Sequence, residues 1–378
     1  MDYKRCYAVV SLAAVRENLM QVRSRLEPGV SLLTVVKANA YGHGSVEVAR
    51  YTEDISDLFG VACLEEAVEL REAGIEKPIL ILGYTSPSQY ETLLEYRISP
   101  TIYDYDQAVL LSKAAMKMNT LALVHIALDT GMTRIGFRAS KESLRKIIDI
   151  SNLPNIDLTG IFTHLSCADM EGDAAAAQTK MQFDEFDYML EILNYSHIDF
   201  EFVHAFNSAC IMQQNDRGYT CARSGIVTYG MYPSDEVDKN ALKLQSALSW
   251  YAHVINVAET EEGRPVSYGA TYTTNRPVTK IATVSAGYAD GYPRLLSNKG
   301  RVLINGKYAP IIGRICMDQF MVDASEIDDV KTEDVVTLIG RDGENEITAD
   351  EIANLTGTIN YEITCDISPR VERIYKES

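Results

Sequence analysis

The residue with the clearest chemical potential in this 378-residue chain is Lys37, which closes a run of apolar and β-branched residues beginning at position 31. We expect that run to form a buried strand, with Lys37 at its carboxyl end before a tight loop containing Gly42 and Gly44. Burial favours the neutral form of an amine, which is the nucleophile that captures a carbonyl as a Schiff base. An isolated lysine at a strand end more often extends into solvent, so its surroundings must decide.

Two further candidates follow later strands of the chain. Arg134 lies in a loop bracketed by Gly131 and Gly136, where a guanidinium can hold a carboxylate through two hydrogen bonds. His164 follows another apolar run and can orient or polarise a base. Taken singly, each residue has an ordinary alternative. Arg134 can be a surface loop arginine, and His164 can be a histidine at the rim of the core that hydrogen-bonds to the backbone.

A third group of residues is suited to holding a phosphate. His204 is followed closely by Ser208, and Arg223 is followed by Gly225 and Ile226. Hydroxyl and backbone N–H groups in such loops are typical phosphate ligands. A lysine for an aldehyde and a pocket for a phosphate together indicate pyridoxal 5'-phosphate as the cofactor.

The elements that must position these residues form a regular alternation of short strands and helices. Eight such βα units in one run favour a closed (β/α)8 TIM barrel, whose chemistry lies at the carboxyl ends of the strands. We expect the strands near residues 31–37, 58–62, 78–82, 98–103, 120–128, 156–163, 200–205 and 219–223.

The pattern changes after Gly230. A polar stretch over 234–243 precedes short β-rich segments, so we expect an α/β barrel over residues 1–245 and a mainly β domain over 246–378. The first strand, 5–10, can join the β domain. Within that domain we expect strands at 250–258, 280–286, 301–305, 311–314 and 335–339, a hairpin turn at Asn305-Gly306, and one helix at 350–355.

Composition excludes several classes of function. A net charge of −18 opposes binding to nucleic acid and to anionic membranes. No run approaches the roughly 20 apolar residues that span a bilayer, and no signal peptide is evident. The seven cysteines are scattered, which favours a reducing cytoplasm over a disulfide framework.

Competing catalytic motifs are weak or absent. The segment Gly42-His43-Gly44 lacks the third glycine of a dinucleotide loop, and there is no phosphate-binding P-loop or nucleophile elbow. We expect no metal site, because none of the histidines has ligand spacing: His43, His125, His164, His197, His204 and His253.

The segment from Val36 to Gly44, Val-Lys-Ala-Asn-Ala-Tyr-Gly-His-Gly, resembles the pyridoxal-phosphate signature of the alanine racemases, which are fold-type III enzymes. The likeness continues in order through six further motifs and covers nearly the whole chain. These motifs are Asp129-Thr130-Gly131-Met132, Arg223-Ser224-Gly225-Ile226, Ser267-Tyr268-Gly269, Gly287-Tyr288-Ala289-Asp290-Gly291-Tyr292-Pro293-Arg294, Ile315-Cys316-Met317-Asp318 and Ile359-Asn360-Tyr361-Glu362.

The resemblance implies a pyridoxal-phosphate barrel, a C-terminal β domain and a homodimer whose active sites draw on both subunits. It assigns Lys37 as the Schiff-base lysine and as the base on one face of the substrate's α-carbon. Tyr268 matches the base on the opposite face, supplied by the other subunit. A free tyrosine has a pKa near 10, so Tyr268 needs cationic or hydrogen-bonding neighbours, which His164 and Arg223 can supply. Racemisation needs two such proton-transfer groups on opposite faces.

The remaining roles implied by the resemblance concern binding. Arg223 faces the cofactor's ring nitrogen and keeps it unprotonated, which limits side reactions such as transamination, and His204 supports Arg223. The phosphate-binding positions are matched by Tyr41, Ser208, Gly225, Ile226 and Tyr361. The contacts to the substrate carboxylate are matched by Arg134 and the backbone of Met317. The approach to the site is matched by Tyr288, Arg294 and Arg314.

Two departures from the family pattern stand out. Many relatives carry a carbamylated lysine two residues before Asp129 that braces the arginine, whereas this chain has Ala127. No carbamate can form there, so Arg134 is held in another way, for example by an anion, or is not braced at all. The N-terminal strand also lacks the family's usual tryptophan and acidic residue.

The leading hypothesis is the interconversion of L- and D-alanine, which supplies D-alanine for peptidoglycan. A serine or broad-specificity amino-acid racemase is the nearest alternative; Tyr361 favours a methyl over a hydroxymethyl side chain, by roughly 1–3 kcal/mol per small group. A non-catalytic pyridoxal-phosphate-binding protein would lack the second domain and Tyr268. A decarboxylase of the same barrel type would keep an acidic partner for the ring nitrogen, where this chain has Arg223.

Overall fold

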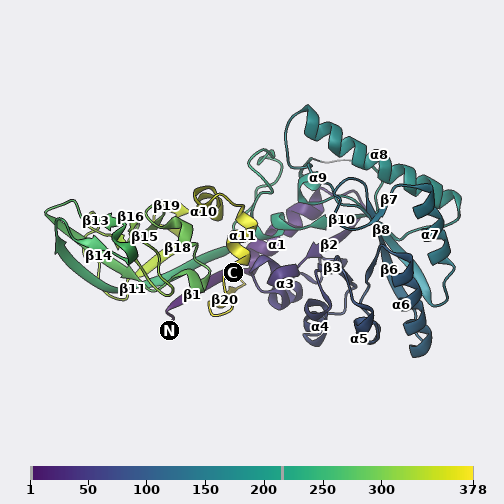
Figure 1. The fold of residues 1–378 in the computed structure, drawn as a ribbon, viewed down its shortest axis with the longest axis horizontal. Helices are drawn as coiled ribbons and strands as arrows, with labels where there is room; N and C mark the ends of the chain where they lie inside the picture. The colour runs from purple at the N-terminus through teal and green to yellow at the C-terminus, as the bar shows by residue number, and fades with distance from the viewer. Residues whose placement is uncertain (1–2, 214–216, 378) are drawn as a thin grey trace. The chain divides into compact units, whose positions relative to one another are not determined.

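The computed structural model describes residues 3–213 and 217–377 of the chain. Contacts between Cα atoms divide it into two compact units, of which the larger contains most of the helices (Figure 1). Unit 1 comprises Met1–Ala13, Tyr41–Gly44 and Ser246–Ser378, and unit 2 comprises Ala14–Ala40 and Ser45–Gln245.

Unit 2 is a barrel of eight main parallel strands. All eight expected strands are present, and the predicted α/β barrel is confirmed. The strands follow the order β2 (Ser31–Val35), β3 (Leu58–Val61), β4 (Ile79–Ile81), β5 (Thr101–Ile102), β6 (Ala122–Asp129), β8 (Ile156–Phe162), β9 (Phe202–His204) and β10 (Cys221–Ser224).

Two hydrogen-bonded arcs make up this barrel, one in the order β10-β2-β3-β4 and the other in the order β5-β6-β8-β9. An isolated parallel bridge between Leu80 and Ser99 joins the arcs on one side. On the other side the Arg223 N–H donates to the Phe206 carbonyl at 3.0 Å. Closure places the ends of all eight strands around one rim, which is the geometry that a barrel active site requires.

Helices surround these strands in Figure 1. Several begin at the caps that their sequences predict. Ser86 forms a capping box with Gln89, and the Asp104 side chain accepts from the Gln107 N–H. The helices are α1 (Leu12–Ser24), α3 (Ser45–Thr52), α4 (Leu64–Glu72), α5 (Tyr90–Glu95), α6 (Tyr105–Met118), α7 (Lys141–Ser151), α8 (Asp173–Tyr195) and α9 (Ser208–Gln213), with short 3-10 turns η1 (Pro87–Gln89) and η2 (Ile226–Tyr229) and the two-residue strand β7 (Phe137–Arg138).

Unit 1 is built on a nine-stranded sheet in the order β19-β18-β15-β16-β17-β14-β11-β1-β20. Alternating burial along β1 and β11 shows that one face of this sheet packs on a core. The strands are β1 (Cys6–Ser11), β11 (Leu248–Glu261), β14 (Val278–Val284), β15 (Arg301–Ile304), β16 (Lys307–Ile312), β17 (Phe320–Asp323), β18 (Val335–Asp342), β19 (Asn345–Ile347) and β20 (Glu372–Lys376), with the small hairpin β12 (Pro265–Val266) and β13 (Tyr272–Thr273) beside them.

In unit 1, the predicted secondary structure agrees with the structure where turn residues mark the end of a strand. Asn305 and Gly306 both have positive φ and join β15 to β16 as a two-residue hairpin, as predicted. The strand expected over 311–314 is wrong in its bounds, because β16 starts at Lys307 and stops before Gly313, whose φ is +76°. Strands β17 and β20 and the helix α11 (Asn360–Cys365) were not expected.

Candidate active site

The segment after Lys37 adopts an unusual left-handed turn. Residues Ala38, Asn39, Ala40 and Tyr41 all have φ of 52–53°, and ψ is 48–51° for the first three. Left-handed geometry costs L-residues about 1–2 kcal/mol each and is normally adopted by single residues. Four in succession at the carboxyl end of β2 therefore indicate a strained backbone that the surrounding structure must hold in place.

Two side chains of unit 2 hold this turn. The Glu66 carboxylate, in α4, accepts from the Ala38 N–H and from the Ala62 N–H, at 2.7 Å in both cases. The Asn39 amide oxygen accepts from the N–H of Ser45, the first residue of α3, at 3.0 Å. These contacts tie the backbone beside Lys37 to two neighbouring elements. Neither Glu66 nor Asn39 was among the predicted site residues.

Arg223 is the most firmly held charged group in unit 2. It lies in β10 and is 5% exposed. Its Nη1 donates to His204 Nδ1 at 2.9 Å and to the His204 carbonyl at 2.8 Å. Its Nη2 donates to the carbonyls of Thr163 (2.9 Å) and Ala205 (3.1 Å) and to His164 Nδ1 (3.2 Å). These five acceptors are all uncharged, so they fix the guanidinium without cancelling its positive charge.

His164 lies in the field of three cations. Burial, then Arg223, Arg134 and Lys37, lower the pKa of His164 to about 3. The imidazole is therefore neutral at ordinary pH. Of these three cations, Arg223 contacts His164 directly, whereas Arg134 and Lys37 act on it through their charge alone. Gln182 in α8 fixes this point of the backbone, since its Nε2 donates to the His164 carbonyl at 2.9 Å.

The phosphate candidates of unit 2 also come together. The Gly225 N–H donates to Ser208 Oγ at 3.1 Å, which links the loop after β9 to the loop after β10. Because Ser208 Oγ accepts this bond, its own proton is left to be donated elsewhere. Ile226 follows directly as the first residue of η2 and is buried. Arg134, by contrast, lies in an exposed loop after β6.

The predicted residues Tyr41 and Tyr361 lie together in unit 1, with ring centroids 5.9 Å apart. Tight backbone approach positions Tyr41. At Gly42, where φ is +86°, a Cβ atom would come within 2.0 Å of the Thr364 carbonyl oxygen in α11. Only glycine fits there, which explains one glycine of the Lys37 loop.

Tyr268 follows a strained residue of unit 1. Ser267 has φ 64° and ψ −178°, a region that is essentially restricted to glycine. Its hydroxyl donates to the Arg314 carbonyl at 2.5 Å and so holds the turn. Tyr268 is 68% exposed, Met317 52% and Tyr288 42%. Arg294 and Arg314 are exposed as well.

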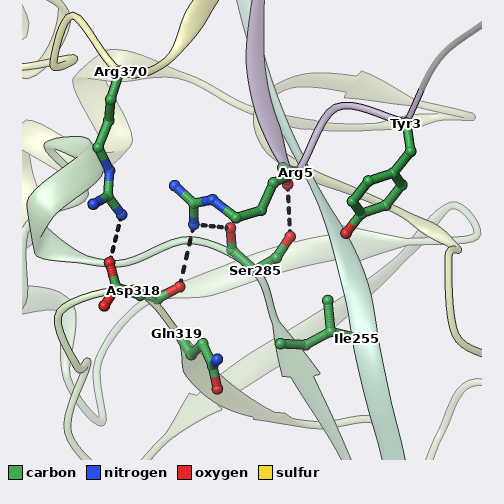
Figure 2. A pocket seen from close by; sticks show the side chains of 7 residues that line it. All are labelled: Tyr3, Arg5, Ile255, Ser285, Asp318, Gln319 and Arg370. Carbon is green, nitrogen blue, oxygen red and sulfur yellow. Dashed lines mark hydrogen bonds and ion pairs between the residues drawn. The ribbon is translucent and has the colours of Figure 1, made fainter.

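A cleft in unit 1 is lined by none of these residues. Figure 2 shows this cleft of about 500 Å³, with Arg5 and Arg370 reaching Asp318. Both arginines also pair with the buried Asp290. It is lined by Tyr3, Arg5, Ile255, Ser285, Asp318, Gln319 and Arg370, none of which was predicted to carry chemistry. This cleft therefore does not mark the candidate active site.

Residues 3–213 and 217–377 contain neither a membrane-spanning helix nor a cluster of metal ligands. No helix in these ranges is long and apolar enough to cross a membrane. No group of three or more histidine, cysteine, aspartate or glutamate side chains in the same ranges is arranged to hold a metal ion. All seven cysteines are free thiols.

Comparison with known proteins links both units to a single family. Residues 10–233 match the model of the alanine racemase N-terminal domain, and residues 247–375 match that of the C-terminal domain. An alanine racemase of Clostridium tetani is 43% identical over 371 residues, which is 98% of this chain and 95% of the relative.

Solved structures give the same result. An alanine racemase of Clostridium difficile 630 superposes with a TM-score of 0.94 at 39% identity, covering 100% of this chain and 97% of the other. The alanine racemase of Bacillus anthracis, solved with bound L-Ala-P, has a TM-score of 0.92 at 35% identity, covering 100% of this chain and 96% of the other.

Proposed function

Because the chain belongs to the alanine racemase family, we propose that it is an isomerase that interconverts L- and D-alanine and supplies D-alanine for peptidoglycan. The observation that carries this proposal is the match of both units, in order and over nearly the full chain, to alanine racemases of known structure. A relative solved in complex with cycloserine adds support, since that ligand resembles a cyclised amino acid.

The residues of unit 2 fit pyridoxal 5'-phosphate, the cofactor of this family. The buried Arg223 guanidinium, surrounded by uncharged acceptors, suits an unprotonated ring nitrogen as one more acceptor. Ser208, Gly225 and Ile226 offer hydroxyl and backbone N–H donors that suit a phosphate, and we assign Tyr41 and Tyr361 to the same task. When bound at Lys37, the cofactor acidifies the substrate's Cα–H bond.

We assign the proton transfers to two groups of this chain. Lys37 Nζ removes or returns the proton on one face of the substrate's α-carbon, and Tyr268 Oη does so on the other. Arg134 and the Met317 backbone orient the substrate carboxylate, while Tyr288, Arg294 and Arg314 line the approach. His164 and His204 act only through hydrogen bonds, because their lowered pKa values keep both imidazoles neutral.

A homodimer is part of the proposal. The unit 1 residues assigned to the site, Tyr268, Met317 and Tyr288, are exposed to solvent in the single chain. Exposure of large apolar groups supports their burial against a second copy. We further propose a domain boundary at residues 245–246, with β1 in the β domain because it pairs with β11 and β20. Free cysteines support a cytoplasmic location.

A chiral assay tests the proposed activity. The purified protein, loaded with pyridoxal 5'-phosphate, is given L-alanine, L-serine and L-lysine separately, and each D-product is quantified. We expect the alanine rate to exceed the other two. A higher serine rate would make this a serine racemase, and retained cofactor colour without any racemisation would favour a non-catalytic binding protein.

Two substitutions test the residue assignments. Lys37→Ala should lose the cofactor's visible absorbance after dialysis and should not be labelled by borohydride. Tyr268→Ala should slow the two directions of racemisation unequally, because only one face loses its proton-transfer group. Full and equal rates in both directions would remove Tyr268 from the mechanism, and retained colour in Lys37→Ala would remove Lys37.

A further inference from the structure

His125 extends the row of groups that holds Arg223. His125 lies in β6, and its Nδ1 is 3.0 Å from His204 Nε2. The other nitrogen of His204, Nδ1, is 2.9 Å from Arg223 Nη1. Both imidazoles are buried, at 2% and 0% exposure. Three side chains from three different strands thus form one continuous line of hydrogen bonds inside unit 2.

The direction of each hydrogen bond in this row follows from the arginine. A guanidinium can only donate, so His204 Nδ1 must accept and carries no proton. A neutral imidazole has one proton, which must then lie on His204 Nε2. That proton points to His125 Nδ1, which accepts it. His125 therefore carries its own proton on Nε2.

Burial keeps both rings in this neutral state. Burial lowers the pKa of His125 to about 3. Burial, then Arg223 and His125, lower the pKa of His204 well below its ordinary value. An imidazolium at His204 would place an Nδ1–H against the Arg223 guanidinium, so a charged His204 is doubly unfavourable.

The ring of His125 is held at a defined position. It stacks on Phe202, with centroids 5.6 Å apart and planes 16° from parallel. On the neighbouring strand β8 the paired residue is Gly160, where a Cβ atom would lie 2.3 Å from His125 Nδ1. A side chain at position 160 would displace the imidazole. The barrel therefore reserves space for this ring and aims its Nδ1 at His204.

We propose that His125 is a positioning residue, which fixes the tautomer of His204 and through it the orientation of the Arg223 guanidinium. The inference rests on the proposed function, in which Arg223 faces the cofactor's ring nitrogen. Without an acceptor at position 125, the buried Nε2–H of His204 loses its partner. His204 then exchanges tautomers or turns, and Arg223 loses one of the acceptors that hold Nη1.

Two variants separate the acceptor from the ring. His125→Phe keeps an aromatic ring of similar size against Phe202 and removes the acceptor. His125→Asn places an amide oxygen where Nδ1 accepts. We expect kcat to fall about tenfold in His125→Phe with little change in KM, and to stay within about twofold of the parent in His125→Asn. Phe202→Leu is the matched control, since it alters the packing of the ring and leaves both nitrogens.

The decisive measurement is made on the apoenzyme. Histidine labelled with ¹⁵N in the ring distinguishes protonated from bare nitrogens, and the chain has only six histidines, assigned by replacing one at a time. We expect His204 to carry its proton on Nε2 in the parent, in His125→Asn and in Phe202→Leu. In His125→Phe we expect a mixture of tautomers.

The outcomes separate this proposal from the proposed function. A parent protein with the His204 proton on Nδ1 would overturn the proposal, as would His125→Phe with a single Nε2–H tautomer and full kcat. If His125→Phe does not fold, the His204 tautomer in the parent and the kcat and tautomer of His125→Asn still decide. A parent that racemises no alanine refutes the proposed function and leaves the tautomer measurement unaffected.

Discussion

Replacing Ala38 by glycine should stabilise the protein, because Ala38 lies in the left-handed turn after Lys37. Glycine reaches this geometry without the steric penalty of a Cβ atom. The Ala38 side chain is exposed, so its removal costs little packing. The expected sign is unusual, since alanine-to-glycine changes in helices and strands normally destabilise a protein.

The magnitude follows from two opposing contributions. Left-handed geometry costs an alanine about 1–2 kcal/mol, which the glycine recovers. The greater freedom of glycine in the unfolded chain costs about 0.5–1 kcal/mol. The free energy of unfolding should therefore rise in Ala38→Gly by an amount between about 0 and 1.5 kcal/mol, centred near 0.75 kcal/mol. Ala177→Gly is the matched control, because Ala177 is an exposed alanine of the right-handed helix α8. It should lower the same quantity by about 0.5–1 kcal/mol.

Urea unfolding of the apoenzyme at several fixed urea concentrations measures both variants against the parent. Equal slopes with urea would show that the comparison concerns stability alone. A third variant, Ala40→Gly, should be close to neutral, since Ala40 is buried and loses a packed methyl group as strain is relieved. The reasoning is refuted if Ala38→Gly destabilises the protein as much as Ala177→Gly does.

Three other substitutions test the contacts that hold the site and the β domain. Glu66→Ala should leave two strand-end N–H groups without their acceptor, lowering the unfolding free energy by about 1–3 kcal/mol and accelerating amide exchange there; Glu66→Gln should retain part of the effect. Asp290→Asn should destabilise the protein at neutral pH. Burial raises the pKa of Asp290, but its two arginines and a backbone N–H lower it by more, so the net pKa lies below the ordinary value. The stability that ionised Asp290 contributes should therefore be lost as pH falls below about 4 in acid-unfolding curves. Ser267→Gly should relieve strain and raise thermal stability, while a less fixed Tyr268 should lower kcat; unchanged kcat would show that the strain has no part in positioning.

The barrel could be predicted because its strands are buried on both faces and appear as short apolar runs between helix signals. The eight strands were found in this way, whereas β20 was not. Its residues, Glu372–Lys376, are not a buried apolar run, and they form a strand because they pair with β1 from the opposite end of the chain. A pairing across more than 360 residues leaves no local signal in either segment.

Some residues of the candidate site could likewise be predicted from local sequence, and others could not. Lys37 and Arg223 could be identified because each follows or ends a recognisable strand. The left-handed turn could not, since alanine does not favour this geometry and asparagine normally adopts it only as a single residue. The contacts of Glu66 and Asn39 hold it in place. His125 was visible only as one of six histidines. The register that pairs it with Gly160 was the missing information, because a glycine opposite a buried histidine marks reserved space.

The structure narrows the role that the sequence suggests for His164. The sequence offered His164 as a cationic or a hydrogen-bonding neighbour of Tyr268. Burial and three nearby cations instead lower the pKa of His164 to about 3, so it is neutral there. Arg223 then provides the positive charge, and His164, accepting at Nδ1, has its proton on Nε2 and can only donate it as a hydrogen bond. A pH–rate profile of the holoenzyme should accordingly show no imidazole titration between about pH 5.5 and 7.5, and a limb near pH 6.5 that disappears in His164→Gln would contradict this assignment.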